Sequence, residues 1–204
     1  MNVLHLDASP RGERSHSRQL TRAFVEELRA AQPGATITYR DLGHEPVPHV
    51  SEAWIAGAFS DPSTHSPEAA AAIAVSNALV DELLASDVIV IGSPMYNFSI
   101  SSTLKAYIDQ IVRTGRTFDP ATYSGLATGK KLFVLDARGA SGYGAGEAME
   151  KLDFQDSYLK AIFGFLGITD ITFVHDEKTM AGESELAHSL ERVRQTARAA
   201  LATA

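Results

Sequence analysis

Short apolar runs and amphipathic segments alternate along the chain from one end to the other. The apolar runs have the length of strands, whereas the segments between them place apolar residues on one helical face, as Leu20, Phe24 and Leu28 do. The runs predict strands at 3–6, 36–42, 88–91, 131–137 and 168–174. Helices are predicted from Ser17 to a stop at 32–34, from Pro67 through Leu84 with Ser66 as N-cap, and at 102–112, 154–165 and 182–201, with room for a short helix near 54–59.

This order of elements determines the expected fold class. Five alternations of strand and helix predict one domain over 1–204, an α/β fold with a doubly wound, five-stranded parallel sheet and helices on both faces. The run at 88–91 is β-branched throughout, which is typical of a central strand. Ligands of such sheets bind beyond the carboxyl ends of the strands, so we expect the functional residues in the loops after Asp7, Gly92 and Ala137.

The first of these loops has the features of a phosphate site. It leads into a predicted helix, whose first backbone N–H groups and positive dipole end attract anions. Ser9, Ser15 and Ser17 offer hydroxyls, and Arg11 and His16 help to make the loop basic in a chain with a net charge of −7. The alternative is that Ser15 or Ser17 only caps the helix while the arginines are solvated. Neither G-x-G-x-x-G nor G-x-x-x-x-G-K-[ST] is present, which disfavours a Rossmann-type dinucleotide site and a Walker site and leaves a monophosphate such as that of FMN.

The second loop suits a flat aromatic ligand. It contains Pro94, Met95, Tyr96, Asn97 and Phe98 directly after the buried strand, where apolar side chains are exposed unless something covers them. The Asn97 amide and the backbone can bind the polar edge of a flavin ring, with Met95 and Phe98 against its apolar part. The alternative is that Met95, Tyr96 and Phe98 fold back as core beneath the following helix.

The segment 94–98, followed by Leu-Lys-Ala-Tyr-Ile-Asp at 104–109, resembles the signature of the FMN-dependent NADH-azoreductase family, which comprises flavodoxin-like quinone and azo reductases. Further similar stretches at 115–118, 128–131, 138–139 and 163–168 follow the family's order, so the resemblance covers essentially the whole chain. It implies a flavodoxin-like fold and a homodimer with one FMN per subunit at the interface. It also implies NADH as electron donor and a quinone or azo compound as acceptor.

The resemblance further assigns the phosphate to Ser9, Ser15, His16 and Ser17, and the isoalloxazine and ribityl chain to residues 95–98. The third loop matches the family's flavin loop at 137–140, but it has Ala137 where some members offer a hydroxyl and Ala140 in place of glycine. The stretch 139–146 is glycine-rich enough for a lid, or it is an ordinary long loop. The candidate cofactor-binding residues are therefore Ser9, Arg11, Ser15, His16, Ser17, Pro94, Met95, Tyr96, Asn97, Phe98, Ala137, Arg138, Gly139 and Ala140.

The acceptor pocket needs apolar walls. Phe118, Tyr123, Tyr143 and Phe163 are the candidates, with core or dimer contact as the alternative for each. Trp54 and Phe59 are residues that a partner subunit is able to bring over a flavin. No side chain is expected to act as a nucleophile, because the flavin N5 carries the hydride in a two-step exchange between NADH and the acceptor.

Composition narrows the remaining options. The chain has no cysteine, which excludes disulfides, Cys-ligated zinc and iron–sulfur clusters. Its acidity argues against nucleic acid and membrane partners, and the lack of a signal or membrane-spanning pattern suggests the cytoplasm. An electron carrier of the flavodoxin type is the alternative function. Six histidines have no metal-ligand spacing and are interpreted as structural or surface residues: His5, His44, His49, His65, His175 and His188.

Overall fold

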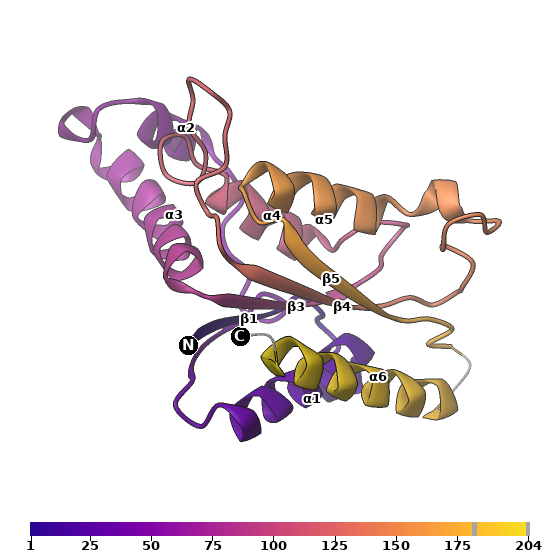
Figure 1. The fold of residues 1–204 in the computed structure, drawn as a ribbon. Coiled ribbons are helices and arrows are strands. Elements are labelled where there is room, and N and C mark those ends of the chain that lie inside the picture. Colours follow the sequence, from indigo (N-terminus) through magenta and orange to yellow (C-terminus); the bar gives the residue numbers. More distant parts are fainter. Residues whose placement is uncertain (181–182, 203–204) are drawn as a thin grey trace.

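The computed structural model describes residues 1–180 and 183–202 and contains a five-stranded, entirely parallel sheet (Figure 1). The strands are β1 (Asn2–Asp7), β2 (Thr36–Asp41), β3 (Val88–Pro94), β4 (Lys131–Ala137) and β5 (Asp170–Asp176), in the spatial order β2-β1-β3-β4-β5. Each pairing is in parallel register, from Val3 opposite Val88 to Ala137 opposite Asp176. All carboxyl ends therefore meet at one edge of the sheet.

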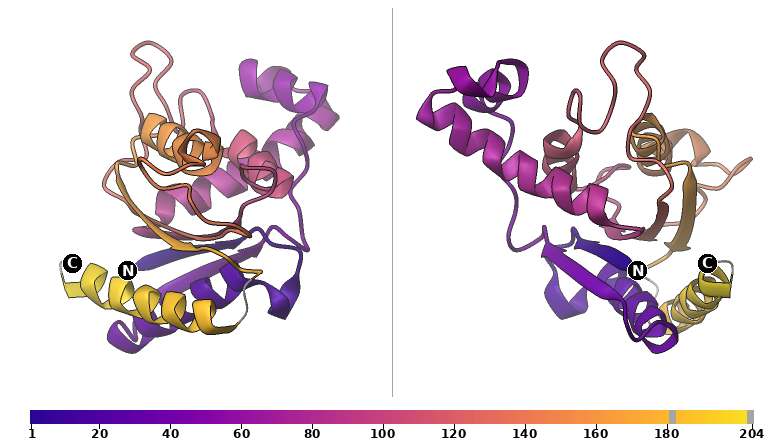
Figure 2. Two further views of the ribbon diagram at one scale, coloured as in Figure 1. Left: turned by 90° about the vertical axis from the view of Figure 1, so that its right-hand side faces the viewer. Right: turned by 60° about the vertical axis from the view of Figure 1, so that its left-hand side comes forward.

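Helices cover both faces of this sheet, as Figure 2 shows. On one face lie α1 (His16–Ala31) and α6 (Glu183–Ala202), which pack against each other. On the other face lie α3 (Pro67–Ala85), α4 (Ser102–Ile111) and α5 (Phe154–Phe165). The short α2 (Glu52–Phe59) packs on α3, and α2 and the loop at 112–130 rise from this layer away from the sheet.

The predicted α/β class is confirmed, and most predicted elements are found within one or two residues of their expected bounds. Ser66 caps α3, because its Oγ accepts a hydrogen bond from the Ala69 amide. The strand expected at 168 begins instead at Asp170, since Gly167 has a φ of +94° and the Ile168 amide still donates to the Phe163 carbonyl to close α5. The predicted start of the last helix at 182 lies outside the described residues.

The core consists of two apolar clusters, one on each face of the sheet. Every residue of β3 is buried, as predicted for a central strand. The chain order reverses between β1 and β3, so the loops that follow these two strands leave the sheet in opposite directions and open a crevice between them. This crevice positions the functional site. Among the described helices, none is both long enough and apolar enough to cross a lipid bilayer.

Gly92 on β3 allows α1 to approach the sheet at this crevice. A Cβ at position 92 would lie 2.5 Å from Oδ1 of Asp7, 2.9 Å from Cγ2 of Thr21 and 3.2 Å from the Ser17 carbonyl oxygen. The first two of these distances are shorter than real Cβ contacts, so a methyl group would push α1 outward.

We expect Gly92→Ala to lower the free energy of unfolding by about 1–3 kcal/mol, the usual cost of overpacking. Urea denaturation of the purified protein measures this change. Gly34→Ala is the matched control, because a Cβ there meets nothing within 4 Å, and its effect should stay within about 0.5 kcal/mol. Equal stability of the Gly92→Ala and Gly34→Ala variants would contradict the close approach.

Candidate active site

The three loops predicted to carry the function converge on one cavity of about 200 Å³ at the carboxyl edge of the sheet. The loop after β1, the loop after β3 and the loop after β4 each line part of it. The turn after β5 adds Thr179 and Met180, for which the sequence carries no motif, although the position of β5 beside β4 accounts for them. The full lining is Ser9, Arg11, Ser15, His16, Pro94, Met95, Tyr96, Ala137, Gly139, Thr179 and Met180.

One end of the cavity is formed by the first turn of α1. Ser15 is the N-cap, and its Oγ accepts a hydrogen bond from the Arg18 amide at 3.4 Å and lies 3.1 Å from Oγ of Ser17. Ser15 therefore caps the helix and also lines the cavity, whereas Ser17 is fully buried and does not line it. The first backbone N–H groups of a helix have no partner within the helix, so those of His16 and Ser17 are available to an anion. Hydroxyls, free amides and the Arg11 side chain form a donor set suited to phosphate.

His16, the first residue of α1, is held by a residue far away in the sequence. Its Nδ1 lies 2.7 Å from Oδ2 of Asp176, at the end of β5. Asp176 is fully buried. No sequence pattern indicates this pair, because 160 positions separate the two residues. His16 is also one of the residues that line the cavity.

The loop after β3 makes a tight turn that presents its side chains outward. The Tyr96 amide donates to the Ser99 carbonyl and the Ser99 amide donates back to the Tyr96 carbonyl, at 2.8 and 3.0 Å. The two central residues, Asn97 and Phe98, have φ values of 49° and 69°. Asn tolerates this left-handed conformation, but for Phe it costs about 1–2 kcal/mol. Strain of this kind is often found at functional sites.

The same turn decides between the two interpretations of its aromatic residues. Tyr96 and Phe98 are each 39% exposed, so the alternative that they fold back as core is wrong. Met95 and Tyr96 line the cavity of about 200 Å³ described above. Asn97 instead lines a neighbouring cavity of about 520 Å³ that shares Tyr96 and continues past Lys105 to Tyr158. Phe98 lines neither cavity, although both lie beside its turn.

The loop after β4 is attached to the loop after β5 by the backbone. The Arg138 amide donates to the Asp176 carbonyl, the Thr179 amide to the Arg138 carbonyl and the Lys178 amide to the Ala140 carbonyl. Ala137 and Gly139 line the cavity, whereas Ala140 does not. Ala140 is absent from the described residues with positive φ, so its replacement of the family's glycine causes no backbone strain.

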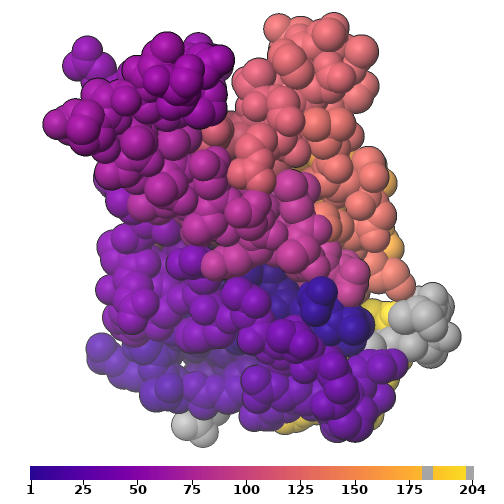
Figure 3. Space-filling model, turned by 90° about the vertical axis from the view of Figure 1, so that its left-hand side faces the viewer, coloured from indigo at the N-terminus to yellow at the C-terminus, as the bar shows by residue number. Residues whose placement is uncertain are grey.

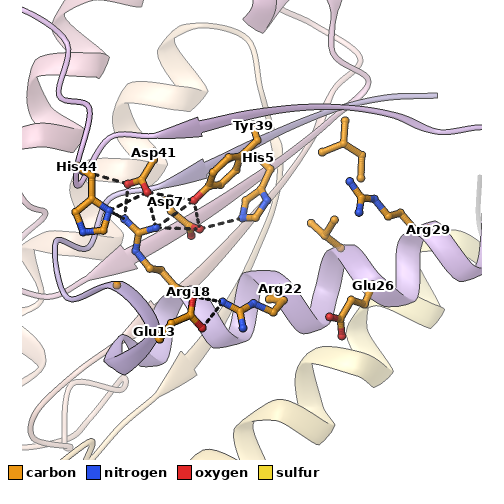
Figure 4. Close-up of a pocket in the computed structure, with 13 residues that line it drawn as sticks. His5, Asp7, Glu13, Arg18, Arg22, Glu26, Arg29, Tyr39, Asp41 and His44 are labelled. Carbon is orange, nitrogen blue, oxygen red and sulfur yellow. Dashed lines mark hydrogen bonds and ion pairs between the residues drawn. The ribbon is translucent and has the colours of Figure 1, made fainter.

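A larger cavity, of about 580 Å³, lies on the opposite side of the loop after β1, between α1 and the edge strand β2 (Figure 4). Its polar residues bind one another. Arg18 pairs with Asp41 and donates from Nε to the Ser9 carbonyl at 2.8 Å, and Tyr39 donates to Asp7 at 3.1 Å. Burial and the nearby carboxylates raise the pKa of Tyr39 to about 12. This cluster therefore holds the loop after β1 from the side facing away from the smaller cavity.

The comparisons with known proteins agree with this geometry. A family model described as "Flavodoxin-like fold" matches residues 1–201. An FMN-dependent NADH:quinone oxidoreductase of Nostoc punctiforme is 56% identical over 186 residues, which cover 90% of both chains. The chain belongs to this family of oxidoreductases. An azoreductase of Bacillus anthracis superposes with a TM-score of 0.86 at 29% identity, over 97% of this chain and 98% of the other. A second structure from that organism, an FMN-dependent NADH-azoreductase in complex with FMN, has a TM-score of 0.89 at 24% identity, over 98% and 100% of the two chains, and shows the same fold.

In this member of the oxidoreductase family, the Arg138 side chain does not reach the cavity. It is 1% exposed and is surrounded by carboxylates: Asp153 at 3.0 Å, Asp136 at 3.1 Å and Asp156 at 2.6 Å. The Tyr143 ring lies over its guanidinium, 5.4 Å from the ring centre. The prediction that Arg138 binds the cofactor is therefore corrected for its side chain, which positions the loop after β4 from beneath.

Two of the carboxylates around Arg138, those of Asp136 and Asp156, share one more partner, His175. Burial and the neighbouring Asp136 raise the pKa of Asp156 to about 6. Burial opposes the charge on His175, but the hydrogen bond to Asp136 and its charge outweigh this effect and raise the pKa of His175. Ligand atoms of Asp136, Asp156 and His175 lie within 4.8 Å of one another, a spacing that also occurs at metal sites. Here the Arg138 guanidinium already pairs with both carboxylates, so the cluster is an ion-pair network.

The aromatic candidates for the acceptor pocket have different surroundings. Phe163 is fully buried in the core, so its assignment to the substrate is wrong, and Tyr143 is buried against Arg138. Phe118 packs against Phe165 with ring centres 4.9 Å apart. Tyr123 is 70% exposed on the loop at 112–130 and remains available to a ligand or a partner. Trp54 and Phe59, the two residues expected to reach a partner's flavin, differ in exposure. Trp54 is buried and donates to Gln110, whereas Phe59 is 71% exposed.

The raised pKa of Asp156 predicts a pH-dependent stability. Between about pH 4 and pH 6 the folded protein keeps a proton on Asp156 that the unfolded chain has lost. Stability therefore falls as the pH rises through this window, by up to about 1.4 kcal/mol for each pH unit from this group. In Asp156→Asn this contribution is absent, so its stability relative to wild type should increase from pH 4 to pH 6 in urea denaturation. Asp170→Asn, at an exposed position of β5, is the control; an Asp156→Asn profile parallel to wild type would contradict the prediction.

Proposed function

We propose that this protein is an FMN-dependent oxidoreductase that takes hydride from NADH and passes two electrons to quinones and aromatic azo compounds in a ping-pong reaction. The observation that carries the proposal is the convergence of a phosphate-type donor set and a strained aromatic turn on one cavity at the crevice between β1 and β3. The names of its relatives, an NADH:quinone oxidoreductase and azoreductases, support the choice of donor and acceptors.

The residues of the cavity fit FMN by their chemistry. The free amides at the start of α1, the hydroxyls of Ser9 and Ser15, and Arg11 and His16 would hold the phosphate. The backbone around Met95 and at 137–139 would contact the polar edge of the ring, and the exposed Tyr96 would cover its apolar part. When bound, FMN supplies the two-electron chemistry by accepting hydride from the nicotinamide and passing it on to the acceptor.

The protein contributes position and surroundings to this reaction. The turn between Tyr96 and Ser99 is fixed by its two backbone hydrogen bonds, and the 137–140 loop by its bonds to the loop after β5. Rigid walls of this kind would hold the nicotinamide first and the quinone or azo acceptor afterwards in the same position. The ping-pong reaction requires this, because both molecules use one site. The cavity of about 520 Å³ beyond Tyr96 is where we place the exchanging substrates. Protons for the reduced acceptor come from solvent.

Anaerobic stopped-flow mixing with NADH tests the proposal. We expect NADH to bleach the absorption band of the bound flavin, and a quinone added afterwards to restore it, because both partners use the same site in turn. Steady-state rates at several quinone concentrations should give parallel double-reciprocal lines. A flavin that NADH reduces only slowly, while a protein donor reduces it rapidly, would support the electron carrier instead.

We further propose that the protein acts as a homodimer. Two projections rise from the helical layer of α3, α4 and α5, with a notch between them (Figure 3). One is formed by α2 and the start of α3, and the other by the loop at 112–130. They carry exposed apolar side chains, namely Ile55 and Phe59 on the first and Tyr123 and Leu126 on the second. A concentration of large apolar residues on raised surfaces is typical of a protein interface. A second copy of the chain would cover them and bring these side chains toward its partner's site.

Phe59→Lys tests the dimer. The new lysine is the last residue of α2, where its positive charge interacts favourably with the helix dipole, so the subunit should still fold. We expect the dimer dissociation constant to rise by at least about tenfold in analytical ultracentrifugation. Gln195→Lys, at an exposed position of α6 on the other face, is the matched control. A wild-type protein that stays monomeric at high concentration, or a Phe59→Lys variant that dimerises as tightly as wild type, would contradict this interface.

A further inference from the structure

Asp176 is a buried carboxylate whose environment the fold alone does not explain. Its side chain is fully buried at the last position of β5. Oδ2 contacts Nδ1 of His16 at 2.7 Å, whereas Oδ1 has no hydrogen-bond partner in the described part of the chain. Buried carboxylates are costly unless several donors or an opposite charge satisfy them. A single contact to a histidine therefore points to a function for the pair.

The geometry of His16 shows what this function requires. An ionised carboxylate only accepts hydrogen bonds, so Nδ1 of His16 donates to Asp176 and Nε2 is the remaining ring nitrogen. Within residues 1–180 and 183–202, Nε2 has no hydrogen-bond partner, and His16, whose side chain is partly exposed, lines the cavity beside Ser15 and Arg11. Nε2 donates to a ligand only when the ring carries a second proton.

Other charged groups near the pair are engaged elsewhere. Arg138 donates its backbone amide to the Asp176 carbonyl, but its side chain pairs with Asp136, Asp153 and Asp156 and approaches Glu177 at 3.9 Å. On α1, Arg18 pairs with Asp41. Besides His16, the titratable side chains that line the cavity among the described residues are Arg11 and Tyr96. His16 is thus the group through which Asp176 can act on a ligand.

We propose that Asp176 positions His16 as a cationic hydrogen-bond donor to the FMN phosphate, and that phosphate binding favours a second proton on the His16 ring. The inference rests on the proposed function, because it requires the phosphate at the start of α1. A solvent proton adds to Nε2 of His16, and the charges then alternate from the Asp176 carboxylate through the imidazolium to the phosphate. No bond between heavy atoms forms or breaks. Asp176 is a positioning residue in this arrangement, since only His16 touches the ligand.

Flavin titrations of the flavin-free protein, followed by quenching of flavin fluorescence, test the positioning role. Riboflavin, which lacks the phosphate, is the control ligand. We expect Asp176→Asn to weaken FMN binding by about tenfold, the effect of losing a charged hydrogen-bond partner. Riboflavin binding should change by less than about twofold. In the His16→Gln background, Asp176→Asn should have no further effect on FMN. Equal losses for FMN and riboflavin, or no loss for either, would overturn the proposal.

Proton uptake gives a second readout that a merely structural role would not change. Isothermal titration calorimetry at pH 8 in two buffers of different ionisation enthalpy counts the protons bound with the ligand. The phosphate of free FMN is already fully ionised there, because its second pKa is about 6. Wild type should take up a fraction of a proton per FMN bound and none per riboflavin bound. The His16→Gln and Asp176→Asn variants should take up no protons with either ligand. Asp176→Ser replaces Asp176→Asn if the latter does not fold. No uptake in wild type would refute the proposal.

Ser15→Asp separates failure of this inference from failure of the proposed site. Aspartate is as good an N-cap as serine, so α1 keeps its start, but its charge repels a phosphate. Loss of FMN binding with retained riboflavin binding places the phosphate at α1. If Ser15→Asp behaves in this way while Asp176→Asn and His16→Gln bind FMN normally, the inference alone is wrong. If Ser15→Asp binds FMN as wild type does, the phosphate site itself is wrong.

Discussion

Buried and partly buried carboxylates line the carboxyl edge of the sheet, and the need to balance their charge organises the site around them. Asp7, Asp41 and Asp176 end β1, β2 and β5, and Asp136 stands one residue before the end of β4. Burying such charges without partners costs several kcal/mol each. Each carboxylate therefore has a basic partner nearby, and these partners belong to the segments that form the cavity. Because each basic group is bound to a carboxylate at or near a strand end, the helix or loop that carries it has a fixed position.

Three basic groups act in this way. Arg18 connects Asp41 with the Ser9 carbonyl, which fixes the loop after β1 from the side of β2. His16 connects the first turn of α1 with β5 through Asp176. Arg138 gathers Asp136, Asp153 and Asp156 beneath the loop after β4. Gly92 lets α1 come close enough to the sheet for the first two contacts to form. Of these groups only His16 lines the cavity itself, together with Arg11, so Arg18 and Arg138 act on the site by holding its segments in place.

The turn after β3 differs from these ion-paired segments, because its backbone is held in a strained conformation. Phe98 has a φ that a bulky residue rarely adopts, and both aromatic side chains of the turn remain partly exposed. The surrounding structure maintains this conformation: β3 is buried along its whole length, and the Phe98 carbonyl accepts a hydrogen bond from the Phe154 amide at the start of α5. A turn that is rigid before the ligand arrives loses little conformational entropy when it binds.

The sequence by itself determined the α/β class, the positions of the strands and helices, and the three loops that carry the site. These features depend on local periodicity, capping residues such as Ser66, and the rule that parallel strands end at one edge. Only the tertiary structure decided which side chains at that edge line the cavity, which are buried and which pair with one another. It buried Phe163 in the core, turned Arg138 away from the cavity and paired His16 with Asp176. Such contacts join residues more than a hundred positions apart or depend on which face of a strand a side chain occupies. They are fixed by the packing of α1, α5 and the loops after β4 and β5 against the sheet, which no local pattern in the chain encodes.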